Sequence, residues 1–190
     1  MRSGSFQTSG VTLRYLNDFD AVVLTGFSQS TTGAGFALTF AGVELTIASQ
    51  AQPSRFADLS NGYLTSGSIQ GTQWLFFKAP GFDPALLDLA EATKQTLTLG
   101  ELLTTGDAIG VTNFTGPVDV VDGDADFPNC SGNCLTPHNV AAAVLPALYP
   151  KASNGSSYYI APLTGHALNY HYATPGAYEH IHGFIKKNGL

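Results

Sequence analysis

The sequence predicts an α/β fold built on a parallel sheet, because strand-like and helix-like segments alternate along its second half. Two short apolar runs, residues 117–122 and 157–162, are each followed by a helical segment, 137–148 and 176–188. A strand–helix–strand–helix order implies parallel strands joined by right-handed crossovers. Residues 20–26 (DAVVLTG) add a third buried strand, which ends at a glycine.

Helix boundaries are predicted from capping residues and prolines. Asp83 and Pro84 suit the N-cap and first position of a helix. Residues 97–104 form a second short helix. The helix after the second strand should end at Pro146, because proline breaks a helix interior. The last helix should take Thr174 as its N-cap.

Composition limits the class of protein. The chain has 190 residues, of which 44% are apolar and 12% charged, so it can bury the core of a single domain. Lys and Arg number 8 against 14 Asp and Glu, and this net charge of −6 argues against nucleic-acid binding. No apolar run reaches about 18 residues, so we expect no membrane span.

Segment lengths predict a core with an inserted lid. Residues 29–110 are too long for a simple crossover, and we expect them to form a helical lid insertion. Residues 20–28 and 111–190 then form the core, and residues 1–19, rich in Gly, Ser and Thr, form an irregular N-terminal segment. The start of the chain has no apolar stretch typical of a signal peptide, which suggests that a front end is missing.

Several features are typical of secreted proteins. Cys130 and Cys134, the two cysteines, lie four positions apart, a spacing that a small disulfide ring, free thiols or a metal site could each use. The redox Cys-x-x-Cys spacing does not match. We expect a disulfide and a secreted protein. Three N-glycosylation sequons begin at Asn113, Asn129 and Asn154.

Carboxylates gather where the second strand ends. Asp122, Asp124 and Asp126 alternate as in a calcium loop, but Phe127 and Asn133 occupy the positions of its required glycine and glutamate. We therefore expect no metal or cofactor. Sites in open parallel sheets form at the carboxyl ends of strands, which makes these aspartates candidates for catalysis.

The strongest candidate pair is Asp126 with His166. His166 lies in the loop just after the third strand, and neighbouring parallel strands end at the same rim of a sheet. An aspartate that accepts from one imidazole nitrogen fixes the tautomer, so that the other nitrogen can serve as a general base. The remaining histidines offer weaker patterns: His138, His171, His180 and His182.

These segments together resemble the C-terminal part of an α/β-hydrolase, most closely the secreted fungal members. The resemblance covers about residues 20–190 and implies Asp126 as the catalytic acid and His166 as the base. It rests on DAVVLTGFS, the lid-like insert, PVDVVDGDADFPNC and YYIAPLTGHALNYHY.

The chain departs from the family at the nucleophile. No Gly-x-Ser-x-Gly elbow occurs in it, and the nearest sequence is Gly26-Phe-Ser28-Gln-Ser30, where a serine replaces the last glycine. Ser28, Asp126 and His166 follow the family's order, so Ser28 is the candidate nucleophile. In the family, strands flank the elbow, and in this chain they would have to precede residue 20. We therefore expect the family's own nucleophile to be missing, which leaves Ser28 as the nearest candidate.

Two classes of function follow. The resemblance implies serine esterase or lipase-type acyl hydrolysis of a small apolar ester, with a pocket lined by aromatic lid residues: Trp74, Phe76, Phe77 and Phe82. The alternative is a non-catalytic truncated hydrolase that binds a ligand or partner, or one chain of a composite enzyme. The strand at 20–26 would then be an exposed edge, open to pairing in a homo-oligomer.

Overall fold

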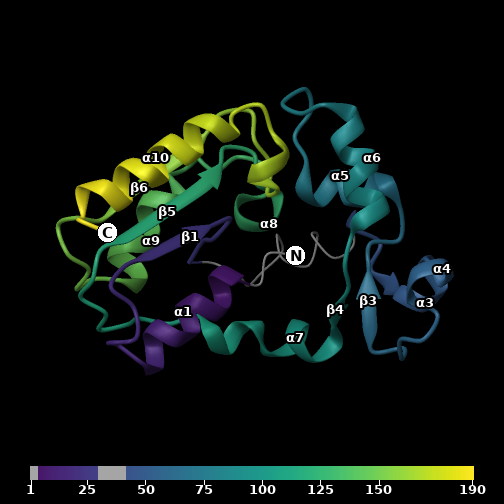
Figure 1. Ribbon diagram of the computed structural model, residues 1–190, viewed down its shortest axis with the longest axis horizontal. Helices are drawn as coiled ribbons and strands as arrows, with labels where there is room; N and C mark the ends of the chain where they lie inside the picture. Colours follow the sequence, from purple (N-terminus) through teal and green to yellow (C-terminus); the bar gives the residue numbers. More distant parts are fainter. Residues whose placement is uncertain (1–3, 30–41) are drawn as a thin grey trace.

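The computed structural model describes residues 4–29 and 42–190 (Figure 1). Its core sheet contains β1 (Val22–Thr25), β5 (Val118–Gly123) and β6 (Ser157–Ala161), which are parallel and lie in the order β1-β5-β6. The predicted α/β class and all three strands are confirmed. Ser30 of the candidate elbow lies outside the described residues.

Helices cover both faces of the sheet, so β5 is buried along its whole length. On one face Val118 and Val120 pack with α9 (Val140–Leu148), and on the other Val121 packs with α10 (Thr174–Lys187). Alternate residues of a strand point to opposite faces, which explains why β5 reads as an almost continuous apolar run.

The predicted irregular segment at residues 1–19 contains a helix, α1 (Gly4–Arg14). Its amphipathic pattern is weak, and tertiary contacts hold it: Ser5 Oγ donates to Thr25 O at 2.8 Å and accepts from Thr25 N at 3.0 Å. Ser5 thus provides hydrogen-bond partners for the backbone N–H and C=O of Thr25, on the edge of β1 that no other strand of the sheet covers. Thr12 Oγ1 lies 3.2 Å from the hydroxyl of Tyr149 in the core.

The segment predicted to form a lid contains several short helices and a small antiparallel sheet that the sequence did not indicate (Figure 1). Its strands are too short for a period-2 pattern: β2 (Thr46–Ile47), β3 (Tyr63–Thr65) and β4 (Leu97–Thr98). The lid helices are α3 (Ala48–Ala51), α4 (Pro53–Phe56), α5 (Ile69–Phe76), α6 (Pro84–Thr93) and α7 (Leu99–Thr104). A short helix, η1 (Thr105–Ala108), follows α7. Two further short helices lie outside this segment: α8 (Phe127–Cys130) and η2 (Leu168–Tyr170).

Some predicted boundaries are correct and others are wrong. Asp83 caps α6 by accepting from Ala85 N at 2.9 Å. Helix α9 continues through Pro146, because Tyr149 N still bonds to a carbonyl in its last turn and the helix packs on the sheet. Thr174 is not the N-cap of α10 but its first residue, and its hydroxyl donates instead to the preceding loop.

No helix within residues 4–29 and 42–190 is long and apolar enough to cross a bilayer.

Candidate active site

The acidic side of the site is the turn that follows β5. Asp126 is the N-cap of α8, and its Oδ1 accepts from Asn129 N at 2.9 Å. Its Oδ2 accepts from Asn129 Nδ2 at 3.0 Å. The side chain is fully buried, so these donors replace water around the carboxylate.

His166 meets Asp126 at the rim of the sheet. Its Nδ1 lies 2.7 Å from Asp126 Oδ2, and the His166 residue is only 4% exposed. With Nδ1–H donating to the carboxylate, proton transfer to or from a substrate falls to Nε2. The two residues that the strand-end argument paired are therefore hydrogen bonded.

Asp124 holds the backbone of the loop that leads to His166. Its two carboxylate oxygens each accept a backbone N–H at 3.0 Å, from Leu163 and from Thr164. Leu163 has a φ of 49°, a strained conformation for a branched side chain, and the bond to Asp124 helps to hold it there. The sequence argument treated Asp124 as part of an acidic turn and missed this contact.

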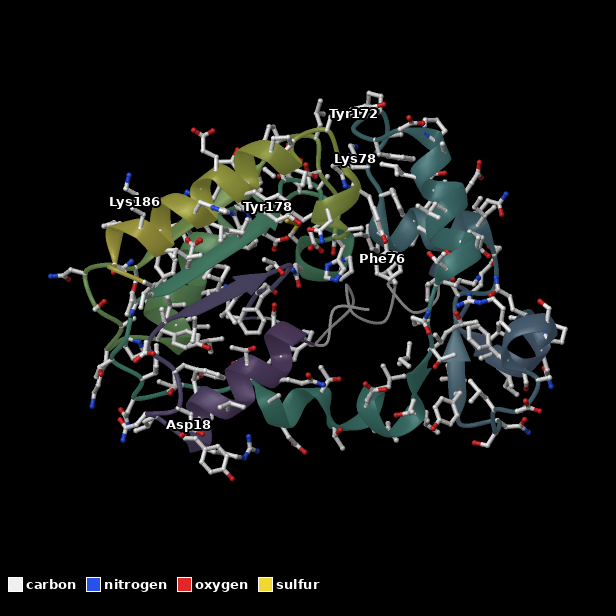
Figure 2. The ribbon with its side chains drawn as sticks, viewed as in Figure 1. Asp18, Phe76, Lys78, Tyr172, Tyr178 and Lys186 are labelled. Carbon is white, nitrogen blue, oxygen red and sulfur yellow. A yellow bond between two sulfur atoms is a disulfide. The ribbon has the colours of Figure 1, made fainter. Side chains whose placement is uncertain are left out.

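His171 ties the same loop to the lid. Its Nε2 accepts from Lys78 N at 3.0 Å and from Gly165 N at 3.1 Å, and its Nδ1 donates to Ala167 O at 2.9 Å. This set of partners requires the neutral ring with the proton on Nδ1. In Figure 2 Lys78 lies where the lid approaches the core. Only the three-dimensional fold brings these groups together, so no sequence signal marked His171.

Asp122 is a second buried carboxyl beside Asp126. It is 1% exposed, accepts from Gly123 N at 2.8 Å, and accepts from Asn129 Nδ2 at 2.9 Å. Burial, followed by the negative charge of Asp126, raises the pKa of Asp122 well above its ordinary value, although His166 and Asn129 act in the opposite direction.

A disulfide between Cys130 and Cys134 closes the acidic turn, as expected. Cys134 N donates to Asp124 O at 2.9 Å, so the ring is fastened to the same turn. The aspartates of this turn do not converge: Asp124 faces the His166 loop, whereas Asp122 and Asp126 share Asn129. Among the described residues no cluster of three His, Cys, Asp or Glu could hold a metal ion.

The end of β1 lies against the imidazole of His166. A Cβ placed on Gly26, whose φ is +57°, would lie 3.1 Å from His166 Cε1, so only glycine suits this position. Ser28 follows two residues later and is 1% exposed. The structure therefore places the candidate nucleophile in a buried position just after the glycine that packs on His166.

An apolar cavity of about 340 Å³ separates the lid from the loop that follows His166. Phe76 and Phe77 line it, and the ring of Phe76 lies 5.8 Å from that of His166, at the junction of lid and core (Figure 2). The other two predicted aromatics lie elsewhere. Trp74 is 50% exposed and packs on Phe127, and Phe82 packs on Phe77 inside the lid.

The lining of this cavity also includes the polar residues Ser66, Thr72 and Lys94. Lys94 pairs with Glu91 at 2.6 Å, Glu91 accepts from Thr72 at 2.7 Å, and the hydroxyls of Thr72 and Ser66 lie 2.6 Å apart. The cavity thus combines apolar side chains with a few hydrogen-bonded polar groups, which suits a ligand with an apolar body.

The other candidate residues lie away from this pair. His180 Nε2 bonds to buried Asp119 at 2.8 Å near the far end of β5, whereas His138 and His182 are exposed. Two of the sequon asparagines, Asn113 and Asn154, are exposed. The amide of the third, Asn129, is bonded to the two carboxyls, and a glycan there would break that contact.

Comparison with known proteins supports the fold. No family model and no curated protein sequence matches the chain. A solved monoacylglycerol lipase from Paleococcus ferrophilus aligns with 97% of the chain and 66% of its own length, with 8% identity and a TM-score of 0.56. A serine hydrolase involved in carbazole degradation aligns with 96% of the chain and 60% of its own length, with 15% identity and a TM-score of 0.38.

The chain therefore spans about two thirds of the length of that lipase, and the arrangement of its parallel sheet and helices is that of an α/β-hydrolase fold.

Proposed function

We propose that this site serves acyl-ester hydrolysis, with Asp126 and His166 as its acid–base pair. The observation that carries the proposal is the buried 2.7 Å contact between His166 Nδ1 and Asp126 Oδ2 at the rim of a parallel sheet. The adjoining apolar cavity supports a small apolar ester as substrate. The fold shared with a monoacylglycerol lipase supports the same reaction class.

In the proposed reaction a serine oxygen attacks the carbonyl carbon of the ester, and the serine proton passes to His166 Nε2. The imidazolium then gives that proton to the departing alcohol, as the bond between the carbonyl carbon and the alkoxy oxygen breaks. Water hydrolyses the acyl-serine by the same route. Asp126 remains ionised throughout and stabilises the imidazolium.

Ser28 is the nucleophile that we propose within this chain. It follows a strand of the core sheet and lies two residues beyond the glycine that packs on His166. It is almost completely buried, at 1% exposure, so the proposed reaction requires a movement that admits substrate to it.

A fluorophosphonate probe tests this assignment, because it labels an activated serine covalently. We expect labelling at Ser28, its loss in Ser28→Ala and His166→Ala, and its retention in the controls Ser60→Ala and His182→Ala, which change exposed side chains. Hydrolysis of a short p-nitrophenyl ester should follow the same pattern. A folded wild-type protein that takes no label would contradict a nucleophilic Ser28.

The second candidate is a protein without its own nucleophile, which binds a ligand or completes a site with another chain. The absence of Gly-x-Ser-x-Gly from the sequence and the 1% exposure of Ser28 favour this candidate. It predicts no labelling of this chain alone, with ester hydrolysis regained on mixing with a chain that supplies a serine. Light scattering would then detect a complex, and a homo-oligomer if β1 pairs with its own copy.

Export to an oxidising compartment is part of the proposal, because the acidic turn is closed by a disulfide. The exposed sequons Asn113 and Asn154 are the expected glycan positions. Intact mass before and after glycosidase treatment of protein secreted from eukaryotic cells would test both points.

A further inference from the structure

Two buried carboxyls, those of Asp122 and Asp126, lie next to each other on the Nδ1 side of His166. The proposed chemistry uses only Asp126. Asp122 and Asp126 are both almost completely buried, and they share the amide of Asn129, whose Nδ2 lies 2.9 Å from Asp122 Oδ2 and 3.0 Å from Asp126 Oδ2. Two carboxyl oxygens that accept from one amide nitrogen lie close together, and two negative charges so close in a buried site favour a proton on one of them.

The partners of the two side chains decide which one holds that proton. Asp126 accepts from Asn129 N, from Asn129 Nδ2 and from His166 Nδ1, whereas Asp122 accepts from Gly123 N and Asn129 Nδ2. More donors favour the ionised form. The negative charge therefore belongs on Asp126 and the proton on Asp122, in agreement with the raised pKa of Asp122.

We infer that Asp122 is a positioning residue that stays protonated and donates a hydrogen bond to Asp126, so that Asp126 alone carries negative charge beside His166. In the described part of the chain, the side chains that act on Asp122 are those of Asp126, His166 and Asn129, whereas the carboxylate of Asp124 accepts from the backbone of the His166 loop.

The effect on His166 follows from simple electrostatics. Two ionised carboxylates would stabilise the imidazolium so strongly that His166 would stay protonated near neutral pH and could not act as a base. A proton held between the carboxyls reduces the charge that His166 meets, and it also fixes the plane of Asp126. This inference rests on the proposed role of His166 but not on the identity of the nucleophile.

Histidine titration by NMR tests the inference without any turnover. Asp122→Asn keeps a neutral donor, so the pKa of His166 should stay within about 0.3 units of wild type, whereas Asp122→Ala removes a donor from Asp126 and should raise it by about 0.5 to 1 unit. Asp119→Asn is the matched control, since Asp119 is buried on the same strand but bonds to His180.

The opposite outcomes are equally clear. If Asp122 is ionised, Asp122→Asn will lower the pKa of His166 by about one unit or more, because a neighbouring charge is lost. If Asp122 is only structural, Asp122→Ala will leave that pKa unchanged. Either result overturns the inference.

Infrared spectroscopy provides a second measurement should Asp122→Ala fail to fold. Wild type at neutral pH should show the carbonyl band of a buried protonated carboxylic acid, which Asp122→Asn abolishes and Asp119→Asn retains. Absence of the band in wild type also overturns the inference. A protein that shows these signals but hydrolyses no ester would contradict the proposed function alone.

Discussion

At the scale of single residues, Asp124 holds the backbone of the loop that carries His166. Asp124→Ala should destabilise the protein by about 3 kcal/mol, because two backbone N–H groups lose a charged acceptor, each worth about 1.5 kcal/mol or more. Urea unfolding measures the change. Asp88→Ala, an exposed position on α6, should change stability by less than about 0.5 kcal/mol.

Asp122 should also shape the dependence of stability on pH. Its pKa is raised in the folded protein, so between the unfolded and folded values the native state holds a proton that the unfolded chain releases. This contribution is complete below the unfolded value near 4 and is lost as the pH rises through the folded value.

Asp122→Asn removes this loss, since an amide does not titrate. Urea unfolding of both proteins at several pH values should show the variant gaining on wild type as the pH rises from 4 to 8. A constant difference across this range would show that Asp122 titrates alike in the folded and unfolded states.

The Asp126–His166 pair could be predicted from sequence because both residues follow strands that end at one rim. Asp124, His171 and Asn129 could not, since their partners are backbone or carboxyl groups whose approach only the folded loops define. The sequence around a short polar residue beside a glycine turn is the same whether its side chain is hydrated or hydrogen bonded to the backbone of another loop. Sequence alone therefore cannot separate the two cases.

At the scale of elements, the end of β5 and the His166 loop approach so closely that only glycine fits between them. A Cβ on Gly123 would lie 2.2 Å from Thr164 O. Gly123→Ala should therefore cost about 1 to 3 kcal/mol in unfolding free energy, and it should shift the NMR signals of the His166 ring.

Gly183→Ala is the matched control for this substitution. Gly183 lies inside α10, and a Cβ added there would have nothing within 4 Å of it, so alanine should stabilise the helix by about 0.5 to 1 kcal/mol. Equal effects of the two substitutions would refute the steric argument.

Element prediction succeeded where a segment carried its own signal, and failed where distant contacts decide. The three core strands are apolar runs bounded by glycine or proline, and Asp83 caps α6 in the expected way. Helix α1 lacks such a signal, because Ser5 and Thr12 fix it through bonds to β1 and to the core.

At the scale of the whole molecule, lid and core are joined through the loop that carries His166. Besides the contacts of His171 to Lys78 and Gly165, Ala167 N bonds to Phe76 O at 2.8 Å and Tyr172 N bonds to Gly81 O at 2.8 Å. These bonds lead us to expect that wild type unfolds in one cooperative transition.

Replacing His171 by alanine should weaken that junction, because two backbone N–H groups lose their acceptor. Calorimetry should then show a broadened or divided transition, with the lid amides exchanging hydrogen faster than those of β5. A single sharp transition at a uniformly lower temperature would indicate that lid and core remain one unit.

From the sequence we expected an inserted segment at residues 29–110, but not the small sheet that lies within it. Strands β2 and β4 pair on either side of β3, and they are separated by about 50 residues of helix and turn. Each of them pairs with β3, and strands of two or three residues are too short to leave a periodic pattern in the sequence.

The disulfide turn has a consequence for how the acidic half of the site could arise. The backbone and side-chain donors from Asn129 that hold Asp126, and the cysteine ring that closes the turn, lie within thirteen consecutive residues, 122–134. Asp126 can therefore acquire these supports early in folding, before the distant imidazole docks. Because these supports are local in sequence, we expect residues 122–134 to keep an ordered carboxylate when they are placed after a strand of another parallel sheet.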